Sequence, residues 1–270
     1  MNEVVVVDED VPPAFDGVRM VFVSDIHCGD LYSPGRMREL VGLINSLRPD
    51  IVLLGGDYTY SIWDDDDPAN VGPCLREFSN LTAPLGVYAV LGSHDNWAGH
   101  DMSMEALADA GVKVLDNSAE WVVLNGSRIK IGGVGDVGKK ANWLSFRDGR
   151  LKLGGFSDLW NGSQDITPTV EDAGEGDFVM LLAHDPRFAE RLDNSKVDLV
   201  LSGHTHGGQV TFFGWLPDTL LRLKGYSNLK GVYDMEHARL IVTTGVGTGG
   251  LPLRFFARPE VVVLTLRSKN

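Results

Sequence analysis

The chain has 270 residues, 43% of them hydrophobic, so it can bury a sizeable core as one large domain or two small ones. Lysine and arginine number 24 and aspartate and glutamate 37, which gives a formal net charge of −13. This charge argues against a nucleic-acid polymer as partner, because basic residues that neutralise phosphates dominate such binding.

The amino terminus and the cysteines bear on the cellular compartment. Residues 1–10 are acidic and hold an apolar run of only four residues, whereas a signal peptide needs a basic start and a longer apolar stretch. A membrane span needs about 20 apolar residues. Cys28 and Cys74 are too few for a disulfide framework; one bridge between them stays open, but we expect two free thiols. These features predict a cytoplasmic protein.

Short apolar runs alternate with helical patterns through the first half of the chain. We expect strands at residues 18–23, 50–54 and 87–91, and helices at 36–47, 74–81 and 102–110. Ser33 and Pro34 are start signals for the first helix. The alternation predicts parallel strands, an arrangement in which ligands collect beyond the carboxyl ends of the strands.

From about residue 112 the predicted strands are shorter. They lie at 112–115, 120–124, 128–133, 178–183, 197–202, 239–244 and 261–266. Residues 138–172 are rich in Gly, Asn, Ser and Asp, and we interpret them as long connecting loops that could form a lid. We find no linker or internal repeat, so we predict a single α/β domain over residues 1–270, with two packed sheets and a core at about 18–266.

Five short polar motifs follow predicted strands and hold five of the seven histidines. In chain order they are Ser24-Asp25-Ile26-His27, Gly55-Gly56-Asp57, Gly92-Ser93-His94-Asp95, Ala183-His184-Asp185-Pro186 and Gly203-His204-Thr205-His206-Gly207-Gly208-Gln209. Imidazole and carboxylate groups are costly to bury unpaired, so packing alone does not require this pattern. Divalent metal ions are held by such side chains, and the motifs therefore predict a metal centre.

Two divalent ions about 3.5–4 Å apart need a carboxylate that both can share. Asp25 and His27 can converge on one ion, and Asp57, which follows two glycines, can approach both. Nitrogen ligands from the later strands would be His184, His204 and His206. Taken singly, Asp57 reads as a turn residue and His184 as a core histidine, so only the combination of motifs indicates a dinuclear site.

Other polar and apolar stretches have simpler interpretations. The four aspartates at 64–67 lack the spacing of a calcium loop, and we expect a solvated loop. Residues 212–217 and the leucines up to residue 223 could line an apolar groove or touch a bilayer surface, but we favour a packed loop. We assign no role to His100 or His237.

The five motifs resemble those of the calcineurin-like metallophosphoesterase superfamily: Asp-x-His, Gly-Asp, Gly-Asn-His-Asp/Glu, a later His and Gly-His-x-His. The Gly-His-Thr-His-Gly-Gly-Gln motif and the tail from Gly245 to Glu260 resemble one bacterial branch. The resemblance covers about residues 18–266. It implies a two-sheet β-sandwich flanked by α-helices, with two divalent ions between the sheet ends. The ligand types suit manganese, iron, zinc, cobalt or nickel.

The resemblance also implies residue roles. It assigns one ion to Asp25, His27, Asp57 and His206, and the other to Asp57, His184 and His204. A hydroxide that bridges the ions would attack phosphorus, while His94, oriented by Asp95, would assist the leaving group. Arg254 is a candidate substrate-binding residue, although it could instead pack the tail.

Ser93 departs from the family pattern, which has asparagine at this position. The asparagine gives an amide oxygen to the second ion, whereas a serine hydroxyl is shorter. Ser93 could coordinate that ion directly, leave room for a water, or weaken the second site, and we include it among the candidate metal ligands.

We predict a dinuclear metal-dependent phosphodiesterase acting on a small-molecule diester, because we see no cluster of Arg and Lys to clamp a dianionic phosphate. One alternative is a pyrophosphatase for a nucleotide-linked lipid precursor such as UDP-2,3-diacylglucosamine, which some relatives cleave. Another is a scaffold that has lost the chemistry, for which only Ser93 speaks.

Overall fold

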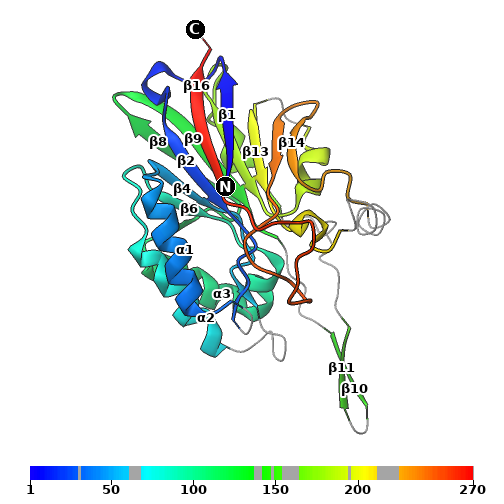
Figure 1. Ribbon diagram of the computed structural model, residues 1–270. Helices are drawn as coiled ribbons and strands as arrows, with labels where there is room; N and C mark the ends of the chain where they lie inside the picture. Colours follow the sequence, from blue (N-terminus) through cyan, green and yellow to red (C-terminus); the bar gives the residue numbers. More distant parts are fainter. Residues whose placement is uncertain are drawn as a thin grey trace.

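The computed structural model describes residues 1–29, 32–60, 68–136, 142–146, 149–153, 164–193, 196–211 and 225–269. Two six-stranded sheets pack against each other (Figure 1), with strand orders β1-β16-β2-β4-β6-β7 and β14-β15-β13-β12-β9-β8. The predicted two-sheet α/β architecture is therefore confirmed, and all ten predicted strands are present.

The first sheet is mainly parallel. Its strands are β1 (Asn2–Asp8), β2 (Arg19–Val23), β4 (Ile51–Leu54), β6 (Val87–Ala89), β7 (Lys113–Val114) and β16 (Val262–Ser268). The sequence did not predict β1, which pairs with β16 along its whole length and extends the sheet to residue 2, beyond the expected core start at 18. Its four consecutive valines hide the alternation of an edge strand, in which Val6 is buried while Val5 and Val7 are exposed.

The second sheet has a parallel centre and antiparallel edges. Its strands are β8 (Ser118–Leu124), β9 (Ser127–Val134), β12 (Val179–Ala183), β13 (Leu199–Ser202), β14 (Gly231–Asp234) and β15 (Arg239–Val242). The strands β9, β12, β13 and β15 pair in parallel, and β8 and β14 pair antiparallel at the two edges. Apolar side chains from both sheets, such as Phe22 and Met180, form the core between them.

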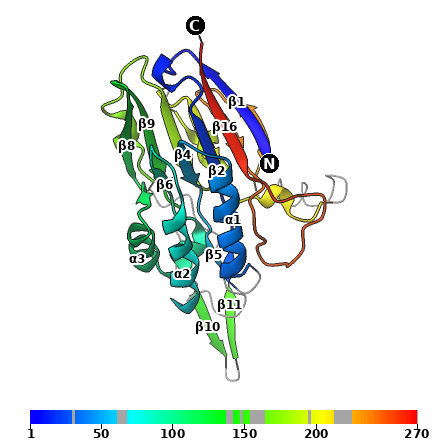
Figure 2. The ribbon, with the colours of Figure 1, turned by 60° about the vertical axis from the view of Figure 1, so that its left-hand side comes forward.

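Helices cover the outer face of the first sheet (Figure 2). They are α1 (Pro34–Ser46), α2 (Pro68–Leu75) and α3 (Ser93–Asp109). Helix α1 begins as predicted, since the Ser33 hydroxyl accepts the Arg36 N–H. The helix predicted at 74–81 corresponds to the end of α2, at Leu75, and to the 3₁₀ helix η2 (Arg76–Asn80), so its α-helical part lies earlier than expected.

Helix α3 begins nine residues before the predicted start at 102, with a kink at Gly99. Its first turn contains the Gly92-Ser93-His94-Asp95 motif, so the motif residues begin a helix rather than lie in a loop. Three further 3₁₀ segments are η1 (Pro13–Phe15), η3 (Pro186–Arg191) and η4 (His206–Gly208).

Residues 138–172 are not only loops. They include the antiparallel hairpin β10 (Asn142–Phe146) and β11 (Gly149–Leu153) and the short helix α4 (Thr167–Val170). The content of glycine and polar residues led to the loop prediction, but the backbone pairing of β10 with β11 does not require an apolar sequence. The acidic run at 64–67 and the apolar stretch at 212–223 lie outside the described residues.

The expectation of two free thiols is wrong. Cys28, in the short strand β3 (Cys28–Gly29), and Cys74, in α2, form a disulfide with Cα atoms 6.0 Å apart. Strand β3 pairs with β5 (Thr59–Tyr60), and only this tertiary arrangement brings two cysteines 46 residues apart together. The cysteines therefore no longer support a reducing compartment. No helix in the described segments is long and apolar enough to cross a bilayer.

Candidate metal centre

The polar motifs converge because they follow strands whose carboxyl ends meet at one end of the two sheets. They follow β2, β4 and β6 in the first sheet and β12 and β13 in the second. Hydrogen bonds join the loops. The backbone N–H of His27 donates to the Asp57 carbonyl at 3.0 Å, and the backbone N–H of His204 donates to both Asp25 carboxylate oxygens at 3.0 Å. The loops at the ends of the two sheets thus form a single polar cluster.

The backbone at this cluster has an uncommon conformation. Five predicted ligands have positive φ angles between 50° and 68°: Asp25, His27, Asp57, His204 and His206. Non-glycine residues rarely adopt this left-handed region, and such conformations cost about 1–3 kcal/mol each and collect at functional sites. Their concentration here indicates that the loops are shaped to aim side chains.

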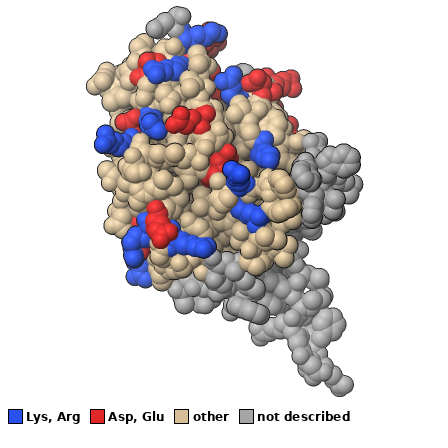
Figure 3. Space-filling model, in the orientation of Figure 1, with Lys and Arg blue, Asp and Glu red and all other residues tan. Residues whose placement is uncertain are grey.

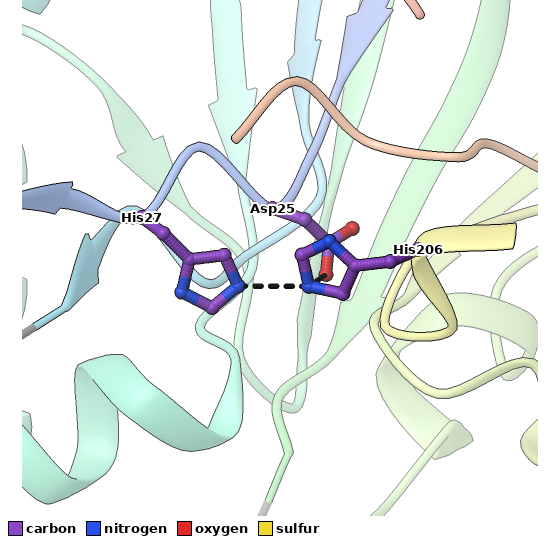
Figure 4. Close-up of side chains that lie close together, drawn as sticks. All are labelled: Asp25, His27 and His206. Atoms are coloured by element: carbon purple, nitrogen blue, oxygen red, sulfur yellow. Dashed lines mark hydrogen bonds and ion pairs between the residues drawn. The ribbon is translucent and has the colours of Figure 1, made fainter. Parts of the chain in front are cut away.

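A first set of ligand atoms comes from Asp25, His27 and His206, all within 4.8 Å of one another (Figure 4). The Nε2 atoms of His27 and His206 lie 3.0 Å apart, and Asp25 Oδ1 lies 3.5 Å from His206 Nε2. Two nitrogen ligands with bonds of about 2.1 Å at a right angle are also about 3.0 Å apart. This spacing fits one shared metal ion.

The imidazoles of the first set are held neutral. Burial lowers the pKa of His27 to about 3, and burial, with His27 and the Arg254 guanidinium close by, lowers the pKa of His206 well below its usual value. Only neutral imidazole has a lone pair for a metal ion, so this environment suits a ligand.

A second set consists of Asp57, His184 and His204. Nδ1 of His184 lies 2.6 Å from the Gly55 carbonyl oxygen and must donate to it, so Nε2 is the ring nitrogen that faces Asp57 and would face an ion. Within the described part of the chain, His184 Nε2 and His204 Nδ1 are buried and have no hydrogen-bond partner. Orphaned buried nitrogens of this kind are what a metal ion would satisfy.

Asp57 connects the two sets. Its Oδ2 atom lies 3.7 Å from His27 Nε2 and 3.2 Å from His184 Nε2, while Oδ1 accepts the His94 N–H at 2.9 Å. Although burial opposes it, the neighbouring imidazoles, His184 above all, hold the pKa of Asp57 well below its ordinary value. One ionised oxygen therefore stands between the two sets, as a shared ligand requires.

Gly249 leaves space beside the first set. A Cβ atom built there would lie 3.3 Å from His206 Nε2 and 3.5 Å from His27 Nε2. A side chain at this position would thus fill the volume that a metal ion and its ligands need.

His94 and Ser93 lie next to this cluster. The His94 ring is 4.9 Å from the His27 ring, and ligand atoms of His27, Asp57 and His94 lie within 4.8 Å of one another. Burial lowers the pKa of His94, which favours the neutral ring. Ser93 is buried as the first residue of α3, directly before the backbone N–H that contacts Asp57.

Asp95 makes contacts that the sequence did not predict. Its buried carboxylate accepts the backbone N–H groups of Asp57, Tyr58, Thr59 and Gly92 at 2.7 to 3.3 Å. Asp95 thereby fixes the Asp57 loop to the start of α3, and its orienting role toward His94 stays a prediction.

Arg254 contacts a predicted ligand. Its Nη2 lies 3.1 Å from His206 Nδ1, and its Nε donates to the Gly247 carbonyl at 2.6 Å. It also lines a cavity of about 530 Å³ whose walls include Leu40, Leu43 and Val246. The substrate-binding role of Arg254 remains a prediction.

Two residues near the second set were missed by the sequence analysis. Asp136 follows β9, is buried, and both its carboxylate oxygens lack a hydrogen-bond partner within the described ranges. It obeys the same strand–glycine–aspartate pattern as Asp57 and could have been recognised by it. Tyr226, whose hydroxyl lies 2.7 Å from His204 Nε2, has no local sequence signal.

Residues 18–208 match the family of calcineurin-like phosphoesterases. The chain belongs to this family. It is similar to the uncharacterized metallophosphoesterase YkuE of Bacillus subtilis (strain 168), at 31% identity over 96% of this chain and 82% of that protein. It is equally similar to an uncharacterized metallophosphoesterase of Aquifex aeolicus (strain VF5), at 31% identity over 94% and 86% of the two chains.

Solved structures with a similar arrangement include TT1561 of Thermus thermophilus, with a TM-score of 0.49 and 13% identity over 85% of this chain and 90% of that one. Calcineurin-like phosphoesterases use two divalent metal ions, and the Asp and His sets described above fit that requirement. The chain is therefore a metal-dependent hydrolase of phosphate esters.

Proposed function

We propose that this calcineurin-like phosphoesterase is a phosphodiesterase acting on a small-molecule diester at a dinuclear centre. The observation that carries the proposal is the position of Asp57 Oδ2 between the Asp25–His27–His206 set and the His184–His204 pair. The aspartates and histidines of the five motifs are all present and only Ser93 departs from the family pattern, which speaks against the scaffold alternative.

The preference for diesters rests on how nearby cations are engaged. Arg187 is paired with Asp185 through Nε and Nη2, and Arg254 is bonded to carbonyl oxygens and to His206. A dianionic monoester favours guanidinium groups that are available for bidentate contact. The singly charged diester needs less cationic support. Charges of both signs are interspersed on the face in Figure 3, an arrangement unlike the basic stripe that a nucleic-acid polymer requires.

When bound, the two ions would supply Lewis acidity at the phosphoryl group and lower the pKa of water to near neutrality. Asp57 would hold the centre together, and Asp95 would fix the Asp57 loop against α3. His94, neutral and adjacent to His27, would donate its ring N–H to an oxygen of the substrate. Oxygen and imidazole ligands suit manganese, iron, zinc, cobalt or nickel, and the Cys28 sulfur is engaged in a disulfide.

A comparison of two chromogenic substrates tests the proposal. After metal removal and reloading with Mn²⁺, kcat/KM for bis-p-nitrophenyl phosphate should exceed that for p-nitrophenyl phosphate by about ten-fold or more. The Asp57→Asn variant should lose both activities. Equal rates on the two substrates, or a preference for the monoester, would refute the diesterase assignment.

A second candidate is hydrolysis of a nucleotide-linked lipid precursor such as UDP-2,3-diacylglucosamine. The observation in its favour is the apolar wall of the cavity beside Arg254, together with the exposed side chains of Leu251 and Leu253 on the adjoining loop. Peripheral contact with a membrane would accompany this function. Activity on the acylated substrate that depends on detergent would favour it over the simple diesterase.

A further inference from the structure

His204 is the first histidine of the Gly-His-Thr-His motif, and its two ring nitrogens have different surroundings. Nε2 lies 2.7 Å from the Tyr226 hydroxyl. Nδ1 is buried and has no hydrogen-bond partner among the residues that the structure describes. The ring lies 5.1 Å from that of His184, in the set that would hold the second ion.

The direction of the hydrogen bond between Tyr226 and His204 follows from the second contact of the Tyr226 hydroxyl, which is with Asp185. The Tyr226 hydroxyl donates to Asp185 Oδ2 at 3.3 Å, because an ionised carboxylate can only accept. The tyrosine proton is therefore committed to Asp185, and the phenolic oxygen acts as an acceptor toward the ring. His204 must place its proton on Nε2, which leaves the lone pair on Nδ1.

Asp185 is itself fixed in position. Arg187 Nε donates to both carboxylate oxygens at 3.1 Å, and the Arg187 backbone N–H donates to Oδ1 at 2.9 Å. The guanidinium carbon lies 4.2 Å from the centre of the Tyr226 ring, so the same arginine holds both the carboxylate and the phenol. Asp185 is buried and cannot readily exchange this partner for water.

We propose that Tyr226 is a positioning residue that, with Asp185, locks His204 in the Nε2–H tautomer and so presents Nδ1 to the second metal ion. This inference rests on the metal-binding role proposed for His204. Partners that fix the tautomer of a ligating histidine commonly change metal affinity by about 10–100-fold. The opposite tautomer would place an N–H on Nδ1, where it would exclude the ion and lack an acceptor.

The tautomer can be measured without metal. In the ¹⁵N spectrum of metal-free protein, His204, identified by its absence from His204→Gln, should show a protonated Nε2 and a bare Nδ1. Tyr226→Phe, which keeps the ring and its contact with Arg187, should shift the signals toward a mixture of tautomers. Tyr88→Phe is the matched control, since the Tyr88 hydroxyl donates to the Leu85 carbonyl in another part of the fold. An unchanged Nε2–H tautomer in Tyr226→Phe would overturn the proposal.

Metal binding provides the second readout. Titration of the metal-free wild type with Mn²⁺ should show two ions, and Tyr226→Phe should weaken only the second by about ten-fold. Asp185→Asn, which retains an acceptor for the tyrosine proton, should lose less affinity for the second ion than Asp185→Leu. Two ions bound equally tightly by wild type and Tyr226→Phe would overturn the positioning role but leave the proposed function intact. A wild type that binds no second ion would instead refute the dinuclear site, while the tautomer measurement would still decide the role of Tyr226.

Discussion

His204 donates its backbone N–H to both carboxylate oxygens of Asp25 at 3.0 Å, although 179 residues separate the two in sequence. Asp25 follows a strand of one sheet and His204 a strand of the other. The contact means that a predicted metal ligand also joins the two halves of the fold, so metal affinity and stability depend on the same carboxylate.

Replacement of Asp25 should separate these two contributions. Asp25→Ala leaves the His204 N–H unsatisfied and should lower the free energy of unfolding of the metal-free protein by about 1–3 kcal/mol. Asp25→Asn keeps an acceptor oxygen and should recover much of this stability, yet bind the first ion poorly. Urea denaturation without metal measures the first effect. Asp50→Ala, which removes an acceptor of the Arg19 N–H, is a control that should destabilise without changing metal affinity.

Restoring the family residue at position 93 should strengthen the second site. Ser93→Asn supplies an amide oxygen at the first position of α3, beside the N–H that contacts Asp57. We expect tighter binding of the second ion and a higher diesterase rate when Mn²⁺ is scarce, with little change at saturation. Identical midpoints in a manganese titration of the two proteins would contradict this.

Arg254 should oppose binding of the first ion. A guanidinium only donates, so at 3.1 Å it makes His206 Nδ1 an acceptor and leaves the ring proton on Nε2, which faces His27 Nε2 at 3.0 Å. An ion at these atoms requires that proton to move. Arg254→Met should therefore raise the affinity for the first ion, by about ten-fold. Arg36→Met, in the same cavity, is the control. A lower affinity in Arg254→Met would show that the arginine supports the site.

Asp198 lies at the end of the fold away from the candidate metal centre, directly before β13. We expect it to make the stability of the protein depend on pH. Burial raises its pKa to about 7; the Val179 N–H lowers it, and the charges of Asp8 and Asp10 raise it. Because the folded-state pKa exceeds the ordinary 3.8, its contribution to stability is full below that value and is lost as the pH rises through 7.

Asp198→Asn should therefore be more stable than wild type at pH 8, by about 1 kcal/mol after allowance for partial exposure. The gain should shrink at pH 5. Thermal unfolding of both proteins at the two pH values measures the difference, and Asp193→Asn, at an exposed position, is the control. A gain that is independent of pH would show that the charge of Asp198 is not responsible.

Local sequence patterns predicted much of this fold and of the candidate centre. Asp25, Asp57 and His184 each follow a buried apolar strand, so their positions at the strand ends could be deduced from the order of residues alone. The edge strand β14 was missed because its side chains alternate between half-buried and exposed, without the apolar content of a central strand.

Contacts between distant residues could not be deduced in this way. The pairing of Cys28 with Cys74 depends on how α2 packs beside β3, and the contact of Tyr226 with His204 joins residues that are 22 positions apart in sequence. The contacts of Asp95 with the Asp57 loop were missed for a similar reason, since most of the backbone amides that donate to Asp95 are 36 to 38 residues away in sequence. Such contacts arise from tertiary structure.

The dinuclear centre can be tested by locating metal ions around Asp57. Crystals grown with Mn²⁺ should show two anomalous scattering peaks about 3.5–4 Å apart, one on either side of Asp57 Oδ2. One should be bounded by His27 and His206, the other by His184 and His204. A single peak, or two peaks that do not share Asp57, would contradict the dinuclear centre.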